Sequence, residues 1–141
     1  MGLGESNSVA NQVRITGANL VTDAADATRA FAVENRISGG DLSRLCVIVE
    51  ELFANLVEHG GVGPDASVDL LLSTCPDGVR IVIIAPGRPF DPRLARPGQR
   101  RPDRGGGAGI DIVRSWASHI DYCSSAGRNR LALLIPLRGD G

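Results

Sequence analysis

The stretch LCVIVEELFANLVEHGG, residues 45–61, determines how the rest of the chain is interpreted. Its apolar residues recur three and four positions apart, the spacing of a helix that packs one face against a core. A pair of glycines then follows, which is typical of the end of a helix. The pattern therefore predicts an amphipathic helix with an apolar face made of Leu45, Ile48, Val49, Leu52 and Leu56.

A line of polar residues runs down the flank of this apolar face. Glu51, Asn55 and His59 are four positions apart and so lie on one side of the helix, whereas Glu50 lies on the other. At the border between core and solvent a carboxylate can accept a proton, and an amide oxygen can bind a hard cation such as Mg²⁺. The alternative is an ordinary buried helix whose polar flank is solvated, and the helix taken alone favours that alternative.

Length and composition indicate a single globular domain. The chain has 141 residues, of which 43% are apolar, and we expect one domain over residues 9–138 after a disordered N-terminus, residues 1–8. No apolar run could span a bilayer and no signal segment opens the chain, so we expect a cytoplasmic protein without a membrane partner. A net charge of −1 does not indicate nucleic-acid binding.

Two residue types narrow the chemistry. The three cysteines, Cys46, Cys75 and Cys123, are odd in number and far apart within apolar segments, so we expect buried thiols of a reducing compartment. All fifteen basic residues are arginines. Without lysine the chain has neither a P-loop, whose lysine reaches the nucleotide phosphates, nor Schiff-base chemistry.

The order of the predicted elements indicates the fold class. We expect Asp41 to cap the central helix, and Pro76-Asp77-Gly78 to form the turn of a hairpin. Gly127 and Asn129 fall in the loop predicted between the last two strands. The order implies an α+β two-layer sandwich, in which helices cover one face of a mostly antiparallel sheet. The expected ranges are a strand at 9–16, helices at 19–35 and 41–59, strands at 67–74 and 79–84, a helix at 108–120, and strands at 120–123 and 131–135.

The long segment from Ala85 to Gly107 is rich in proline, glycine and arginine, which is typical of a functional lid or a disordered loop. Near its start, Gly87 would let the backbone approach a planar ring closely, although it also suits an ordinary turn. At its end, the run of glycines before the helix suits an anion site, but also a flexible linker. The arginines between them suit a polyphosphate, an acidic partner or plain solvent exposure.

Four motifs in order, EELFANLVEHG, GRPFDP, GGGAGIDIVR and GRNRLALLIPL, resemble the Bergerat or GHKL ATP-binding fold shared by DNA gyrase, histidine kinases and anti-sigma factor kinases. The chain is most similar to the bacterial anti-sigma factor serine/threonine kinases and their small stand-alone relatives. The resemblance covers residues 13–137.

The resemblance implies an ATP- and Mg²⁺-dependent protein kinase. In it Glu51 matches the general base and Asn55 the Mg²⁺ ligand, and residues 96–104 match part of a lid over the triphosphate. The implied partners are an anti-anti-sigma protein of the STAS type, which is phosphorylated on serine or threonine, and a sigma factor. A homodimer is also expected. The remaining residues expected to bind nucleotide are Gly87 on the adenine side and Arg104, Gly105, Gly107 and Gly109 on the phosphate side.

One position departs from the family pattern. The family usually has an aspartate two residues before the glycine matched by Gly87, and its carboxylate accepts a hydrogen bond from the adenine amino group. This chain has Ala85 there. The second hypothesis is therefore a non-catalytic interaction module on the same fold, with weak or lost nucleotide binding. A severed sensor-kinase domain is disfavoured, because the chain has no histidine-bearing helical hairpin.

Overall fold

The computed structural model describes residues 10–16, 19–59, 62–63, 65–87 and 106–139, and for residues 10, 11, 59 and 106–110 the backbone alone. The disorder predicted for residues 1–8 and the lid predicted at residues 96–104 lie outside the described residues. Among the helices that are described, none has both the length and the apolar character needed to cross a bilayer.

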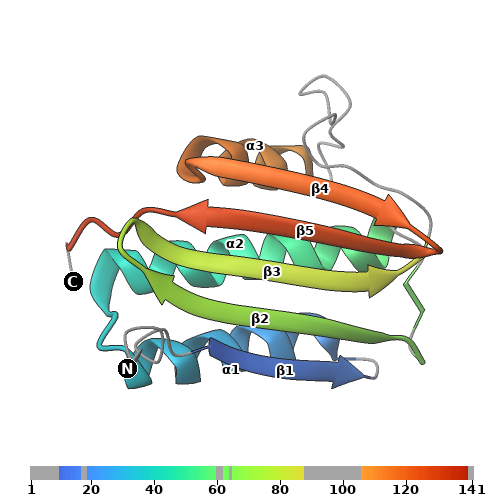
Figure 1. The fold of residues 1–141 in the computed structure, drawn as a ribbon, viewed down its shortest axis with the longest axis horizontal. Coiled ribbons are helices and arrows are strands. Elements are labelled where there is room, and N and C mark those ends of the chain that lie inside the picture. Colours follow the sequence, from blue (N-terminus) through green and yellow to red (C-terminus); the bar gives the residue numbers. More distant parts are fainter. Residues whose placement is uncertain (1–9, 17–18, 60–61, 64, 88–105, 140–141) are drawn as a thin grey trace, which may run out of the picture.

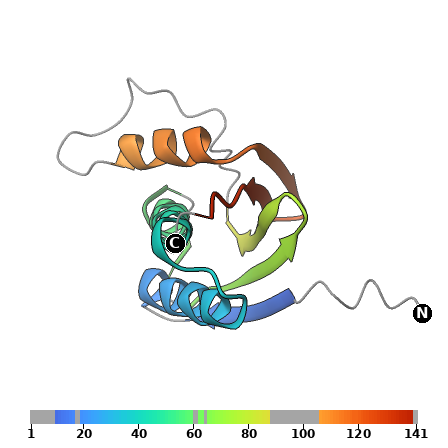
Figure 2. The same cartoon turned by 90° about the vertical axis from the view of Figure 1, so that its left-hand side faces the viewer.

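The described strands form one antiparallel sheet in the order β1-β2-β3-β5-β4. The described helices lie together on one side of this sheet, and none of them covers the other side (Figures 1 and 2). This arrangement confirms the predicted α+β two-layer sandwich. In chain order the elements are β1 (Ala10–Thr16), α1 (Leu20–Glu34), α2 (Gly39–His59), β2 (Ser67–Cys75), β3 (Gly78–Pro86), α3 (Gly106–Trp116), β4 (His119–Ser125) and β5 (Arg128–Ile135).

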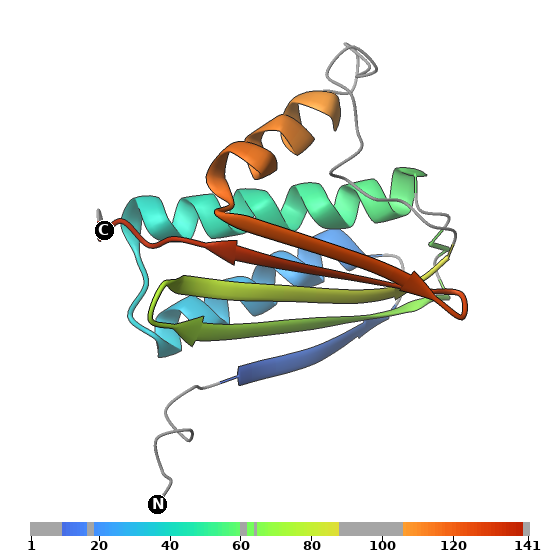
Figure 3. The same ribbon diagram turned by 45° about the horizontal axis from the view of Figure 1, so that its top comes forward.

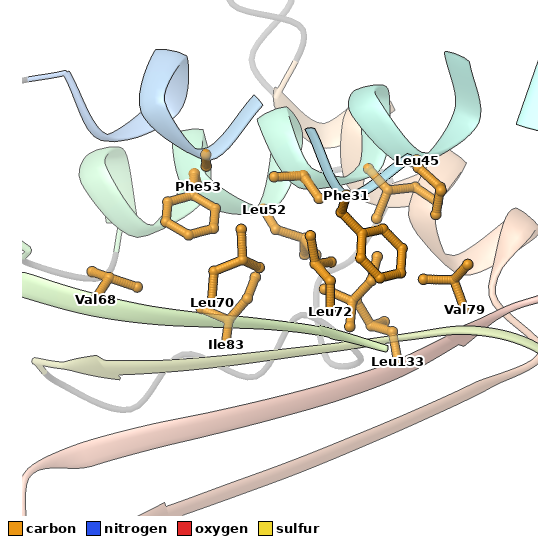
Figure 4. Close-up of a cluster of buried hydrophobic side chains, with 14 of the residues drawn as sticks. Phe31, Leu45, Leu52, Phe53, Val68, Leu70, Leu72, Val79, Ile83 and Leu133 are labelled. Carbon is orange, nitrogen blue, oxygen red and sulfur yellow. The ribbon is translucent and has the colours of Figure 1, made fainter. Parts of the chain in front are cut away.

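The core lies between α1, α2 and the helix-facing side of the sheet (Figure 4). Alternate residues of a strand point to one face, and Val68, Leu70 and Leu72 of β2, which face the helices, are at most 1% exposed. Each large apolar side chain buried in this way contributes about 1.5–3 kcal/mol to the free energy of unfolding. The core residues labelled in the figure come from the helices (Phe31, Leu45, Leu52, Phe53) and from the strands (Val68, Leu70, Leu72, Val79, Ile83, Leu133).

The opposite side of the sheet carries a buried carboxylate. Asp69 of β2 accepts a hydrogen bond from Arg14 Nε of β1 at 2.8 Å, and Arg128 Nη2 at the start of β5 lies 3.7 Å from its other oxygen. A buried charge is costly unless it is paired, and these two arginines supply the pairing. The three side chains therefore link β1, β2 and β5 on this side.

The turn between β2 and β3 needs glycine at its last position. Gly78 has a φ angle of 144°, and a Cβ atom there would lie 2.1 Å from the carbonyl oxygen of Ile135. Only a residue without a side chain allows this approach of the turn to the end of β5. The hairpin predicted from Pro76-Asp77-Gly78 is confirmed.

The prediction that Asp41 caps α2 is wrong, because the helix begins two residues earlier, at Gly39. Its carboxylate instead accepts hydrogen bonds from the backbone N–H groups of Arg138, at 2.8 Å, and Gly139, at 2.9 Å. Arg44 Nη2 donates to the same carboxylate at 2.6 Å. Burial acts to raise the pKa of Asp41, but these donors outweigh it and lower the pKa. Asp41 thus attaches the C-terminal segment to the first turn of α2.

The bounds predicted for the last helix and for the two strands that follow it differ from those in the structure. The last helix stops at Trp116 instead of continuing to residue 120, because the N–H of Ser118 already donates to the carbonyl oxygen of Leu134 in β5. Both closing strands are longer than expected, and Asn129 lies inside β5 instead of in a loop.

The prediction of three buried thiols is wrong for two of them. Cys46 is buried, and burial raises the pKa of its thiol, but Cys75 and Cys123 are exposed. Cys75 ends β2 at the hairpin turn, and Cys123 lies on the edge strand β4, on the side of the sheet without helices. Strand positions at a turn, or on the outer face of an edge strand, remain accessible to solvent.

We expect Asp41→Ala to lower the free energy of unfolding by about 3 kcal/mol, because it leaves Arg44 and two backbone donors without their acceptor. Urea denaturation followed by circular dichroism measures the change. The control Asp23→Ala removes an exposed carboxylate from the first turn of α1 and should cost about 1 kcal/mol or less. Equal costs for the two variants would show that Asp41 does not hold the C-terminal segment.

Candidate functional site

The ends of four elements lie at the same end of the molecule (Figure 3). They are the C-terminal half of α2, the end of β3, the first turn of α3 and the start of β5. Helix α2 runs toward this end, and α3 begins on the same side of the molecule. Within the described ranges, the predicted site residues Glu51 and Asn55 lie on α2, Gly107 and Gly109 lie on α3, and Gly87 directly follows β3.

Glu51 and Asn55 lie one turn apart on α2, as the spacing predicted. Asn55 is only 5% exposed, and its Nδ2 donates to the backbone carbonyl oxygen of Glu51 at 2.7 Å. This bond fixes the rotamer of the amide, and the amide oxygen is the atom that a hard cation would use. Asn55 is therefore held rigidly at the border of the core.

The side chain of Glu51 is partly buried. Burial raises the pKa of the Glu51 carboxyl, and the negative charges of Glu50 and Glu58 raise it further. Glu50 lies on the other flank of α2, where its carboxylate is 3.8 Å from Arg29 of α1. The adjacent glutamates thus face different surroundings, and a raised pKa makes Glu51 the better proton acceptor near neutral pH.

The end of β3 brings a methyl group where a carboxylate was expected from the family pattern. Ala85 is 1% exposed and belongs to the alternate residues of β3 that face the helices. Gly87 follows with a φ angle of 122°, which favours glycine, and its N–H donates to the carbonyl oxygen of Gly127 at 3.2 Å. The backbone at Gly87 is therefore held close to the turn between β4 and β5.

Asn129 is a residue of this region that the sequence did not single out. It lies on β5 directly opposite Ala85, and it is 7% exposed. Its amide oxygen accepts a hydrogen bond from Tyr122, and its Nδ2 donates to the carbonyl oxygen of Gly87 at 3.4 Å. The register of β3 and β5 places Asn129 beside Ala85, whereas the sequence pattern predicts a loop at this position.

The glycine-rich start of α3 lies at the same end of the molecule (Figure 3). Gly107 and Gly109 fall in the first turn of the helix, which begins at Gly106, two residues before the predicted start. The first N–H groups of a helix have no partner within it and carry the positive end of the helix dipole, so they can bind an anion. Arg104 and Gly105, also predicted to bind nucleotide, lie outside the described residues.

A metal ion at this site would take most of its coordinating atoms from a bound nucleotide and water, and few from the protein. In the described part of the chain, no three histidine, cysteine, aspartate or glutamate side chains gather as a metal site. Mg²⁺ commonly uses one or two protein oxygens and takes its remaining ligands from phosphates and water. The amide oxygen of Asn55 fits that pattern.

Comparison with known protein families matches residues 16–135 to the histidine kinase-like ATPase domain. The chain belongs to this family. The match runs from the last residue of β1 to the end of β5 and so includes every element that builds the site.

Among solved structures, the ATPase domain is similar to the histidine kinase domain of the blue-light-activated histidine kinase EL346 from Erythrobacter litoralis, with a TM-score of 0.53 and 14% sequence identity. The similarity covers 86% of this chain and 62% of the other, and it supports the fold alone. None of the curated protein sequences compared with the ATPase domain matches it.

We expect the stability of the ATPase domain to reveal the raised pKa of Glu51. Folding favours the protonated carboxyl of Glu51. The stabilisation from this protonated form is therefore fully present below the pKa that the carboxyl has in the unfolded chain, and it is lost as the pH rises through the pKa that it has in the folded protein. Glu51→Gln, which is uncharged at every pH, should therefore match the wild type in acid and be more stable near neutral pH. Urea denaturation over a pH series measures this.

The matched control is Glu50→Gln, which removes a charge from the other flank of α2 and weakens the pair with Arg29. It should gain less stability near neutral pH than Glu51→Gln, because it relieves only part of the repulsion on Glu51 and also loses the pair with Arg29. If Glu51→Gln shows the same difference from the wild type at every pH, the carboxyl is not destabilised by its surroundings.

Proposed function

We propose that this ATPase domain is a protein serine/threonine kinase of the anti-sigma factor type. The observation that carries the proposal is the pair on α2, in which a partly buried glutamate with a raised pKa stands one turn from a rigidly held asparagine. A base and an amide oxygen in this arrangement serve phosphoryl transfer, which depends chiefly on positioning and electrostatics.

The reaction assigns each group one task. The hydroxyl oxygen of a serine or threonine forms a bond to the γ-phosphorus of ATP, the bond from that phosphorus to the β–γ bridging oxygen breaks, and ADP leaves. Glu51 accepts the hydroxyl proton. Asn55 would hold Mg²⁺, which neutralises charge on the phosphates. The first turn of α3, with Gly107 and Gly109, would bind the phosphates through backbone N–H groups.

The proposed protein substrate is a small anti-anti-sigma protein of the STAS type, and the second partner is a sigma factor. The support is the resemblance of the four sequence motifs to that kinase family, over the same elements that form the site. Such a partner-switching kinase would act as a homodimer in the cytoplasm.

A second candidate function is a non-catalytic interaction module. The observation that favours it is Ala85, because a methyl group cannot accept a hydrogen bond from the adenine amino group. An unmatched donor buried at this position would cost about 1–3 kcal/mol of binding free energy. The module would bind the same partners through its outer surfaces, without phosphorylating them.

We expect Glu51→Gln to reduce phosphoryl transfer by a factor of ~10²–10⁴ while ATP affinity stays within a few-fold, because a positioned base acts on the chemical step. The measurement follows transfer from labelled ATP to the STAS-type partner. Glu50→Gln, which removes the adjacent carboxylate on the other flank, should keep at least half of the wild-type rate. Equal rates for the wild type and Glu51→Gln would exclude Glu51 as the base, and ATP binding without any transfer would favour the module.

A further inference from the structure

Ala85 and Asn129 form a cross-strand pair at the end of the sheet. They are register partners in the antiparallel ladder between β3 and β5, and both are buried. Directly opposed residues point to the same face, with Cβ atoms about 4.5–5.5 Å apart. The side chain of Asn129 thus lies beside the position at which the carboxylate expected from the family pattern is missing.

The amide of Asn129 is held in one orientation. Tyr122, on the neighbouring strand β4, donates its hydroxyl hydrogen to the amide oxygen, and Nδ2 donates to the carbonyl oxygen of Gly87. The second bond is long at 3.4 Å, so exchanging it for another acceptor costs little. An amide oxygen has two lone pairs and its nitrogen two hydrogens, so an amide can take part in more than two hydrogen bonds at once.

An amide in this orientation matches the edge of adenine. Adenine presents an amino donor next to a ring-nitrogen acceptor, and asparagine recognises that pattern by accepting with its oxygen and donating with its nitrogen. Guanine presents a carbonyl oxygen where adenine has the amino group, and that oxygen would oppose the amide oxygen. An amide fixed in one orientation therefore discriminates between the two purines, whereas a freely turning amide does not.

We propose that Asn129 recognises the adenine base, in place of the carboxylate that Ala85 lacks. The inference rests on the proposed function, because it assigns a residue to the nucleotide site of the same kinase. Asn129 supplies the hydrogen bonds to the base, and Tyr122 positions its amide. Gly87, held by the turn between β4 and β5, allows the backbone to approach the ring.

A purely structural role for Asn129 would make different predictions. In that case its amide only ties β5 to the residue after β3, and Asn129→Ala would lower stability without separating base binding from phosphate binding. Inorganic tripolyphosphate carries the phosphates of ATP without the base. The ratio of the affinities for ATP and tripolyphosphate therefore measures the contribution of the base directly.

The experiment is a calorimetric titration of the full chain with ATP, GTP and tripolyphosphate in the presence of Mg²⁺. Asn129→Ala should weaken ATP binding roughly 5- to 100-fold, because the adenine amino group would then be buried without an acceptor. Its affinity for tripolyphosphate should stay within two-fold of the wild-type value. The matched control is Asn35→Ala, which removes another amide that donates to a backbone carbonyl, at the C-terminal end of α1. It should change none of the three affinities.

Tyr122→Phe gives a second test that removes a single oxygen atom. Without the hydroxyl donor the amide of Asn129 can turn over, so the preference for ATP over GTP should fall several-fold. This variant remains informative if Asn129→Ala does not fold. An ATP-to-GTP ratio equal to that of the wild type would overturn the inference.

The outcomes also separate this inference from the proposed function. If the wild type binds ATP and Asn129→Ala keeps the same ATP-to-tripolyphosphate ratio, Asn129 does not recognise the base, while the kinase proposal stands. If the wild type binds neither ATP nor tripolyphosphate, both the inference and the kinase proposal fail.

Discussion

The rotation of α2 about its own axis is the constraint on which the rest of the site depends. Leu45, Ile48, Val49 and Phe53 of this helix are fully buried in the hydrophobic core. A turn of the helix by one residue, about 100°, would move a glutamate into the core and expose large apolar side chains. The cost would be several kcal/mol for each group exchanged, since a buried unpaired charge is far less favourable than a buried leucine. The apolar face therefore dictates where Glu51 and Asn55 lie.

A second interaction, at the N-terminal end of α2, attaches the helix to the segment that follows β5. Asp41 binds two backbone N–H groups of the segment that follows β5, and Arg44 completes its surroundings. Because β5 also carries Asn129 at its opposite end, this attachment links the start of α2 to the strand that borders the candidate site. The core sets the rotation of α2, and the carboxylate sets its attachment to the sheet.

Local patterns in the sequence were sufficient for the elements whose signals are strong. The apolar periodicity of residues 45–56 predicted α2, and the Pro-Asp-Gly turn predicted the hairpin of β2 and β3. The errors arose where partners distant in sequence decide the outcome. The role of Asp41 depends on residues about a hundred positions away, and the end of α3 on a hydrogen bond from Ser118 to β5. Neither contact leaves a local signal.

The candidate site shows the same division. Glu51 and Asn55 belong to one helix, so their spacing alone placed them together. Asn129 and Ala85 are neighbours only through the register of β3 and β5, and the polar residues around Asn129 made the start of that strand look like a loop. The residue that faces Ala85 could not be identified until that register was known. The roles of all the predicted site residues remain predictions, and Arg104 and Gly105 also lie outside the described residues.

The central claim is that the flank of α2 forms the metal-dependent end of a nucleotide site. The most direct test is a calorimetric titration of the wild type and Asn55→Ala with ATP, with and without Mg²⁺. The account predicts that Mg²⁺ strengthens ATP binding to the wild type by at least ten-fold, and that Asn55→Ala loses most of this gain while binding ATP without Mg²⁺ unchanged. An equal Mg²⁺ effect in the two proteins, or no ATP binding by the wild type, would contradict the account.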